Sequence, residues 1–151
     1  MDRDYYDEIN YSPGSNAYSF NSEGSKGVIP KIVVFQTLGE PDHYNLFLSD
    51  FINGQIQGDD VITDNGDIGK VMGTIVQIVN DFTEKFPSYR IIINGSDQTR
   101  KRLYGRIIFN NYRDFSKYYD IEYSNGSGFD FEPYIPTDKN FIPFAFRIAR
   151  K

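Results

Sequence analysis

The fold of this chain is decided by Lys70-Val-Met-Gly-Thr-Ile-Val-Gln-Ile-Val-Asn-Asp-Phe-Thr-Glu-Lys-Phe-Pro-Ser-Tyr-Arg-Ile-Ile-Ile-Asn94. Up to Phe86, apolar side chains fall on one arc at about 100° per residue, which predicts an amphipathic helix. Pro87 ends this helix. Arg90–Asn94 then shows no alternation, which is typical of a strand buried on both faces. We expect these elements to complete a β-α-β unit, residues 61 to 94, with a right-handed crossover.

The chain before this helix predicts an antiparallel meander. The apolar run Lys31–Gln36 is rich in β-branched residues, which favour strands. After a break at Gly39–His43, Tyr44–Ile52 predicts a second strand, and Asp60–Thr63 predicts a short third one. Alternation at Tyr18–Asn21 indicates a further short strand earlier in the chain.

A second helix is predicted from about Arg100 to Tyr118, and Asp120–Tyr123 predicts another strand. The core order is therefore β-β-β-α-β-α, an α+β fold with a mostly antiparallel sheet and two main helices. We expect residues 18–151 to form one domain. Residues 1–17 show little sustained periodicity, a pattern compatible with disorder.

Composition excludes some classes of site. The chain has 151 residues, a net charge of −5 and no cysteine, so disulfides and thiolate metal sites are excluded. No apolar run approaches the roughly 20 residues that span a bilayer, and the acidic N-terminus does not resemble a signal peptide. We expect a cytoplasmic protein without a membrane partner. The single histidine, His43, is assigned to a surface turn, and the acids between residues 59 and 67 lack the spacing of a calcium loop, so no metal is expected.

Positive charge gathers on the second predicted helix. Residues 97 to 117 carry six Lys or Arg against two Asp. Four of the cations fall within about 60° of each other on the side opposite the apolar residues, and Phe109 lies among them. These four are Arg102, Arg106, Arg113 and Lys117. The pattern is typical of a solvated helix face, and it also suits a site where Arg holds a phosphate and the aromatic ring stacks on a base.

The segment Arg100-Lys-Arg-Leu-Tyr104 has the pattern Arg-x-Arg-Leu-Tyr. Together with Tyr18–Ser22, Thr63–Asp67, Lys70–Ile75, Gly95-Ser96 and Phe144–Lys151, it resembles a family of small, functionally uncharacterised bacterial proteins, and it is the most specific of these segments. This resemblance implies a shared fold and no particular activity.

The order of elements also resembles, more distantly, that of the N-acetyltransferase (GNAT) fold. That resemblance implies acetyl-CoA as cofactor, with its pyrophosphate held by backbone N–H groups of the loop Asn65–Lys70. Gly66 and Gly69 would permit close approach and Lys70 could pair with phosphate. However, nearby acids would repel it, and the Gln/Arg-x-x-Gly-x-Gly/Ala pattern of that fold is not met. Tyr104 would be the candidate general acid; its alternative is a core tyrosine.

Gly95 and Ser96 precede the second helix as a phosphate loop would, although no Walker-type motif follows.

Three functions stay open. The first is a non-catalytic binding module with an anion-binding helix face, with a possible protein partner at the aromatic-rich termini and no cofactor. The second is an acyltransferase-like enzyme that uses acyl-CoA. The third is a nucleic-acid-directed, toxin-like protein.

Overall fold

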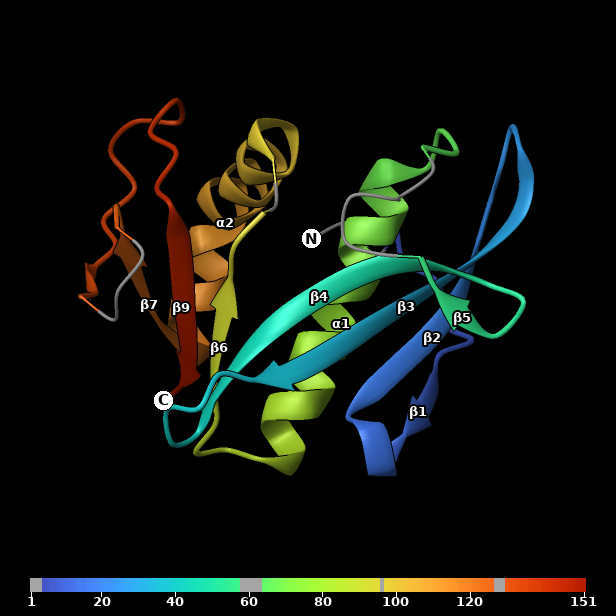
Figure 1. Ribbon diagram of the computed structural model, residues 1–151. Coiled ribbons are helices and arrows are strands. Elements are labelled where there is room, and N and C mark those ends of the chain that lie inside the picture. The colour runs from blue at the N-terminus through green and yellow to red at the C-terminus, as the bar shows by residue number, and fades with distance from the viewer. Residues whose placement is uncertain (1–3, 58–63, 96, 127–129) are drawn as a thin grey trace. The chain divides into compact units, whose positions relative to one another are not determined.

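The computed structural model describes residues 4–57, 64–95, 97–126 and 130–151 (Figure 1). Its two long helices are α1, Ile68–Lys85, and α2, Gln98–Tyr118. A short 3-10 helix spans Pro13–Ser15. The strands are β1 Asn10–Ser12, β2 Ala17–Gly24, β3 Gly27–Thr37, β4 His43–Ile52, β5 Gln55–Ile56, β6 Arg90–Ile93, β7 Tyr119–Ser124, β8 Glu132–Pro133 and β9 Ala145–Arg150. The predicted α+β class with mostly antiparallel strands is confirmed.

The contacts divide the chain into two compact units. Unit 1 comprises residues 1–36 and 47–85, and unit 2 comprises residues 37–46 and 86–151. β4 therefore contributes its first residues to unit 2 and the rest to unit 1. The single domain over 18–151 stays a prediction. The predicted strand Asp60–Thr63 lies outside the described residues.

In unit 1, β2 and β3 form a long antiparallel hairpin, from Ala17 opposite Val34 to Gly24 opposite Gly27. The apolar arc of α1 is buried as predicted, because its periodicity matches one packed face. Near the end of α1, Phe82 is fully buried and stacks on Phe35, with ring centroids 4.0 Å apart.

Tyr6 holds the segment before β1 to the rest of unit 1. This side chain is buried, and its backbone N–H donates to the Thr74 hydroxyl on α1. Its own hydroxyl accepts a hydrogen bond from the Glu23 backbone N–H at 2.8 Å and lies 3.1 Å from the Glu23 carbonyl oxygen. Since β1 pairs only with residues 17–19 of β2, Tyr6 contacts the edge of β2 beyond that pairing.

In unit 2, the strand order is β4-β6-β9-β7-β8. β4 and β6 are parallel, and their pairing joins His43–Asn45 to Arg90–Ile92. β9, near the end of the chain, pairs antiparallel with both β6 and β7. The predicted β6 is confirmed, with Ile91 to Ile93 buried, and α2 follows it. Tail aromatics pack here: Tyr134 makes edge contacts with the rings of Tyr123 and Phe146.

Candidate functional site

The basic face of α2 is defined here as Arg102, Arg106, Phe109, Arg113 and Lys117. Their spacing of four, three, four and four residues keeps them on one side of the helix, along about 22 Å at 1.5 Å per residue. The four cationic side chains are exposed, and Phe109 is half-buried. The opposite side of α2 carries the buried residues Tyr104 and Ile108, and the buried Gly105 lies on the flank between the two sides.

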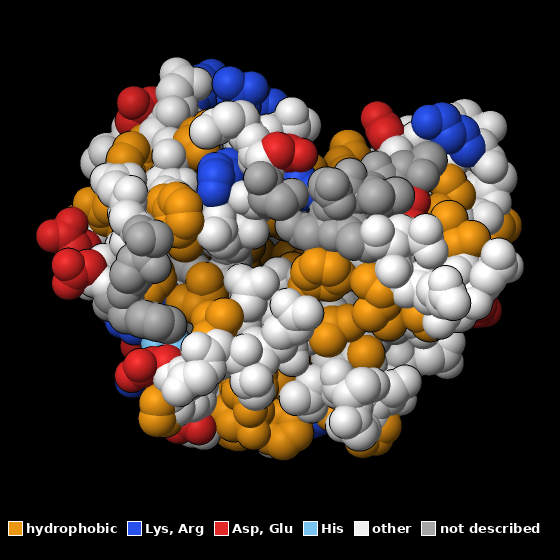
Figure 2. All heavy atoms as spheres, viewed as in Figure 1, with side chains coloured by type: hydrophobic (Ala, Val, Ile, Leu, Met, Phe, Trp, Pro, Cys, Tyr) orange, Lys and Arg blue, Asp and Glu red, His pale blue; other side chains and the backbone are white. Residues whose placement is uncertain are grey.

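Few carboxylates compete for these cations. Lys117 Nζ lies 3.7 Å from Asp114 Oδ1. Because at least half of each side chain is exposed, this ion pair contributes little to the stability of the protein. Within residues 4–57, 64–95, 97–126 and 130–151, Arg102, Arg106 and Arg113 make no ion pair within 4.0 Å. Figure 2 shows acidic side chains at several separate places on the visible surface. Three guanidinium groups of the basic face are therefore available to a ligand, and the same arrangement suits a solvated face.

The start of α2 is occupied by the protein's own side chains. Asp97 caps the helix, and its carboxylate accepts from the Arg100 backbone N–H at 2.8 Å. Lys101 Nζ donates to Asn94 Oδ1 at 2.7 Å. Gly95 is buried, and a Cβ atom there would lie 2.6 Å from the Lys101 backbone nitrogen. The observed role of Gly95 is thus close packing of β6 against the helix start. Ser96 lies outside the described residues.

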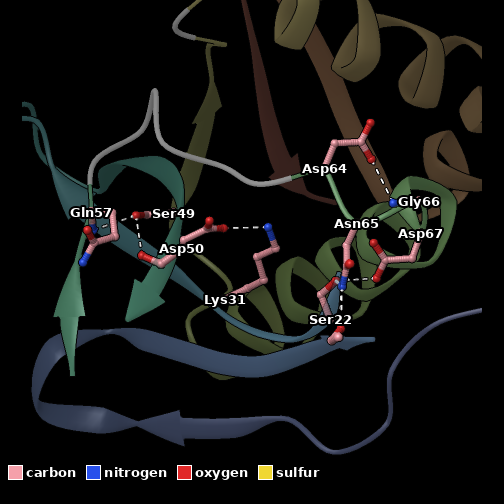
Figure 3. A network of polar contacts seen from close by, with 10 residues as sticks. Ser22, Lys31, Ser49, Asp50, Gln57, Asp64, Asn65, Gly66 and Asp67 are labelled. Atoms are coloured by element: carbon pink, nitrogen blue, oxygen red, sulfur yellow. Dashed lines mark hydrogen bonds and ion pairs between the residues drawn. The ribbon is translucent and has the colours of Figure 1, made fainter. Parts of the chain in front are cut away.

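The second phosphate-loop candidate, at the start of α1, lies in unit 1 (Figure 3). Gly66 has a φ of +80°, and its N–H donates to Asp64 Oδ1 at 3.0 Å. Gly69 is exposed, with open space where a Cβ would be. Lys70 Nζ lies 4.5 Å from the centre of the Tyr6 ring, a cation–π contact. The Lys70 ammonium therefore contacts the Tyr6 ring of the same unit.

Asn65 and Asp67 of this loop are anchors. The Asn65 side chain is buried; its amide group donates to Ser22 Oγ and the Gly27 carbonyl, and its oxygen accepts from the Lys26 backbone N–H at 2.7 Å. The Ser22 hydroxyl donates to Asp67 Oδ2 at 2.6 Å, as Figure 3 shows. These bonds fasten the helix start to the β2–β3 hairpin, and they turn the Asp67 carboxylate toward the hairpin.

A buried ion pair that the sequence analysis did not identify lies on β3 and β4 (Figure 3). Lys31 Nζ is 2.6 Å from Asp50 Oδ1, and the two side chains are 1% and 0% exposed. The neighbouring Ser49 hydroxyl donates to the Asp50 carbonyl at 2.7 Å. Two opposite charges inside strands predicted to be apolar were the available signal. Their burial makes them a structural unit rather than a surface site.

His43 is not a surface turn residue, which corrects the sequence-based assignment. It begins β4 and is only 5% exposed. Its Nδ1 lies 2.9 Å from the Pro41 carbonyl oxygen, so Nδ1 carries the proton, and Nε2 accepts from Arg147 Nη1 at 3.2 Å. Arg147 also donates to Glu122 at 2.9 Å. The arginine comes from β9, more than a hundred residues away in the chain, so no local pattern could reveal it.

Several tyrosines are packing residues, among them Tyr18 and Tyr104. Tyr104 is 8% exposed on the inner side of α2. Burial raises the pKa of Tyr18 far above its usual range, and its hydrogen bond to Asp81 adds to this. A hydrogen bond with Tyr89 raises the pKa of Tyr44 to about 12, with burial adding to the shift. These shifts favour the neutral phenol at ordinary pH.

No cluster of three or more His, Asp or Glu that could hold a metal ion occurs among the described residues. In the same part of the chain, neither helix has the length and apolar character that crossing a membrane requires.

Comparison with protein families gives a match over residues 2–151, to a family model whose members have no known function. No curated protein and no solved structure matches the chain significantly.

Proposed function

Because the chain belongs to a family of unknown function (DUF6934), we propose its function from its own surface: it is a non-catalytic binding module that holds an anionic partner on the basic face of α2. The observation that carries this proposal is the exposure of Arg102, Arg106 and Arg113 on one side of a helix, without a carboxylate partner among the described residues.

An anion can bind this face because replacing water at exposed guanidinium groups costs little free energy. A guanidinium group is always charged and presents several donors in a plane, which suits phosphate and carboxylate oxygens. No internal ion pair with a described residue has to break first at Arg102, Arg106 or Arg113. In a chain with net charge −5, the face concentrates a local field of the opposite sign that guides anions to it.

The test compares two double variants by fluorescence anisotropy with labelled inorganic polyphosphate. Arg102→Gln/Arg106→Gln removes two charges from the face, and Lys26→Gln/Lys139→Gln removes two exposed charges elsewhere as a control. We expect the first to weaken binding at least tenfold and the second to leave it nearly unchanged. Equal loss in both, or no binding by the natural protein, would contradict the proposal.

The order of elements supports a second candidate, an acyltransferase-like enzyme related to the GNAT fold. The helix α1 connects the parallel strands β4 and β6, and α2 follows β6, as that resemblance implies. The first N–H groups of α1 lack intrahelical acceptors, and Gly69 leaves space beside them. Titration calorimetry with acetyl-CoA tests this candidate, with Lys70→Gln expected to weaken binding. Absence of heat at millimolar acetyl-CoA would eliminate it.

Two finer assignments belong with this proposal. We propose that the segment Arg100–Tyr104 is a signature of the family. Its position at the start of α2 supports this, since Arg100 lies 3.8 Å from the Asp97 carboxylate and Tyr104 is buried. A cytoplasmic location is supported by the lack of cysteine.

A further inference from the structure

We infer that the partner of the basic face is a single-stranded nucleic acid. This inference rests on the proposed function and names the class of anion that the face takes. Two features of α2 carry it: the cations stand in a line rather than around a point, and an aromatic ring interrupts that line.

The linear arrangement favours a polymer over a small anion. Arg102 and Arg106 are one turn apart, as are Arg113 and Lys117, so each pair is separated by about 6 Å along the helix. The two pairs are about 10 Å apart, so four cations cannot converge on one phosphate group. The whole row is about 22 Å long, so a backbone that runs along α2 places several phosphates beside the cations. A backbone with regularly repeated charge can contact both pairs at once.

The ring of Phe109 lies in the gap between the pairs. It is half-buried, so its position is set by the helix while part of its surface reaches solvent. No ring contact or cation–π contact involves Phe109 within the portion of the chain that the structure describes. An aromatic face beside a phosphate-binding row is the arrangement on which an unpaired base stacks.

This combination separates single strands from the other polyanions. In a duplex the bases are stacked on one another, so Phe109 would gain nothing from them. An acidic peptide supplies carboxylates for the arginines but no planar base for the ring. The aromatic position therefore predicts preference for a strand whose bases are unpaired.

The experiment measures binding of four labelled 16-unit probes by fluorescence anisotropy: oligo(dT), an abasic strand with the same phosphates, duplex DNA and oligo-glutamate. We expect oligo(dT) to bind best. Removing its bases should weaken binding about fivefold or more, which is the lower end of the effect of one stacked base. The logarithm of its affinity should fall with the logarithm of salt concentration with a slope of about −2.8, for four contacts at about 0.7 each.

Variants then separate the charges from the ring. Arg102→Gln/Arg106→Gln should halve the salt slope to about −1.4. Phe109→Leu keeps an apolar side chain of similar size; it should weaken oligo(dT) binding to the level of the abasic strand without changing the slope. Thermal melting of each variant checks its fold. Phe109 is half-buried, so replacing it can affect folding. The abasic probe needs no substitution, so it tests base stacking on the natural protein even if Phe109→Leu unfolds.

The outcomes distinguish this inference from the proposed function. Equal binding of oligo(dT) and the abasic strand, or equal or tighter binding of duplex or oligo-glutamate, would overturn the inference while the arginine-dependent anion site stands. Absence of binding to all four probes and to polyphosphate would overturn both.

Discussion

Replacing Asp50 with Asn should destabilise the protein by about 3–5 kcal/mol, the usual consequence of breaking a buried ion pair by removing one partner. The structure places the Lys31 ammonium 2.6 Å from the Asp50 carboxylate, with the side chains 1% and 0% exposed. In Asp50→Asn, the opposite charge beside the buried Lys31 ammonium is removed. A buried charge with less compensation costs free energy, and so does the entry of water that would solvate it.

The assay is urea unfolding followed by far-UV circular dichroism. With an m-value of about 2 kcal/mol/M, the midpoint of Asp50→Asn should fall by about 2 M. Lys31→Met should lose a similar amount, because it leaves the carboxylate buried. The double variant Lys31→Met/Asp50→Asn should be more stable than the sum of the two losses implies, since it removes both charges together.

That non-additivity is the decisive measurement. If each single change costs less than about 1 kcal/mol, or if the double loss equals the sum, the two charges are not paired away from water. The reasoning from burial would then be wrong.

Three further predictions concern packing and protonation. Phe82→Ala should cost about 3–5 kcal/mol in urea unfolding, because it empties a fully buried ring site, and an unchanged midpoint would contradict the packing described. Gly95→Ala should lower the melting temperature, because its Cβ would lie 2.6 Å from the Lys101 nitrogen, whereas Gly105→Ala, with open space around it, should not; equal effects would refute the close approach. Tyr18→Phe should be less stable than the natural protein at pH 7, and this difference should shrink above pH of about 10. The folded pKa of Tyr18 is raised, so its contribution is complete below the unfolded pKa and is lost as pH rises; a difference that grows above pH 10 in calorimetry would reverse the sign.

Local patterns were enough to predict the two helices and several strands. The apolar arc that ends at Phe86 and the unbroken run before Asn94 each reflect burial in a regular element, so periodicity alone identifies α1 and β6. The basic face was likewise predictable in its members, since side chains three and four apart share one side of a helix.

Contacts between distant parts of the chain were not predictable. His43 follows Gly39, Pro41 and other turn residues, which favours a surface position, yet Arg147 on another strand covers its Nε2. Lys31 was visible as one charge beside an apolar run, but its pairing with Asp50 depends on strand register, and a shift of one residue turns a side chain to the other face. Whether the basic face binds a partner depends on chemistry outside the chain.

The hydroxyl of Tyr6 has a consequence for association of this protein with itself. Because it accepts the hydrogen bond of the Glu23 backbone N–H and lies 3.1 Å from the Glu23 carbonyl oxygen, it stands where a neighbouring molecule could otherwise add a strand. Cleavage after residue 9, or Tyr6→Ala, would expose the edge of β2 at Glu23. Light scattering should then detect slow self-assembly of the cleaved or substituted protein, and none of the intact protein.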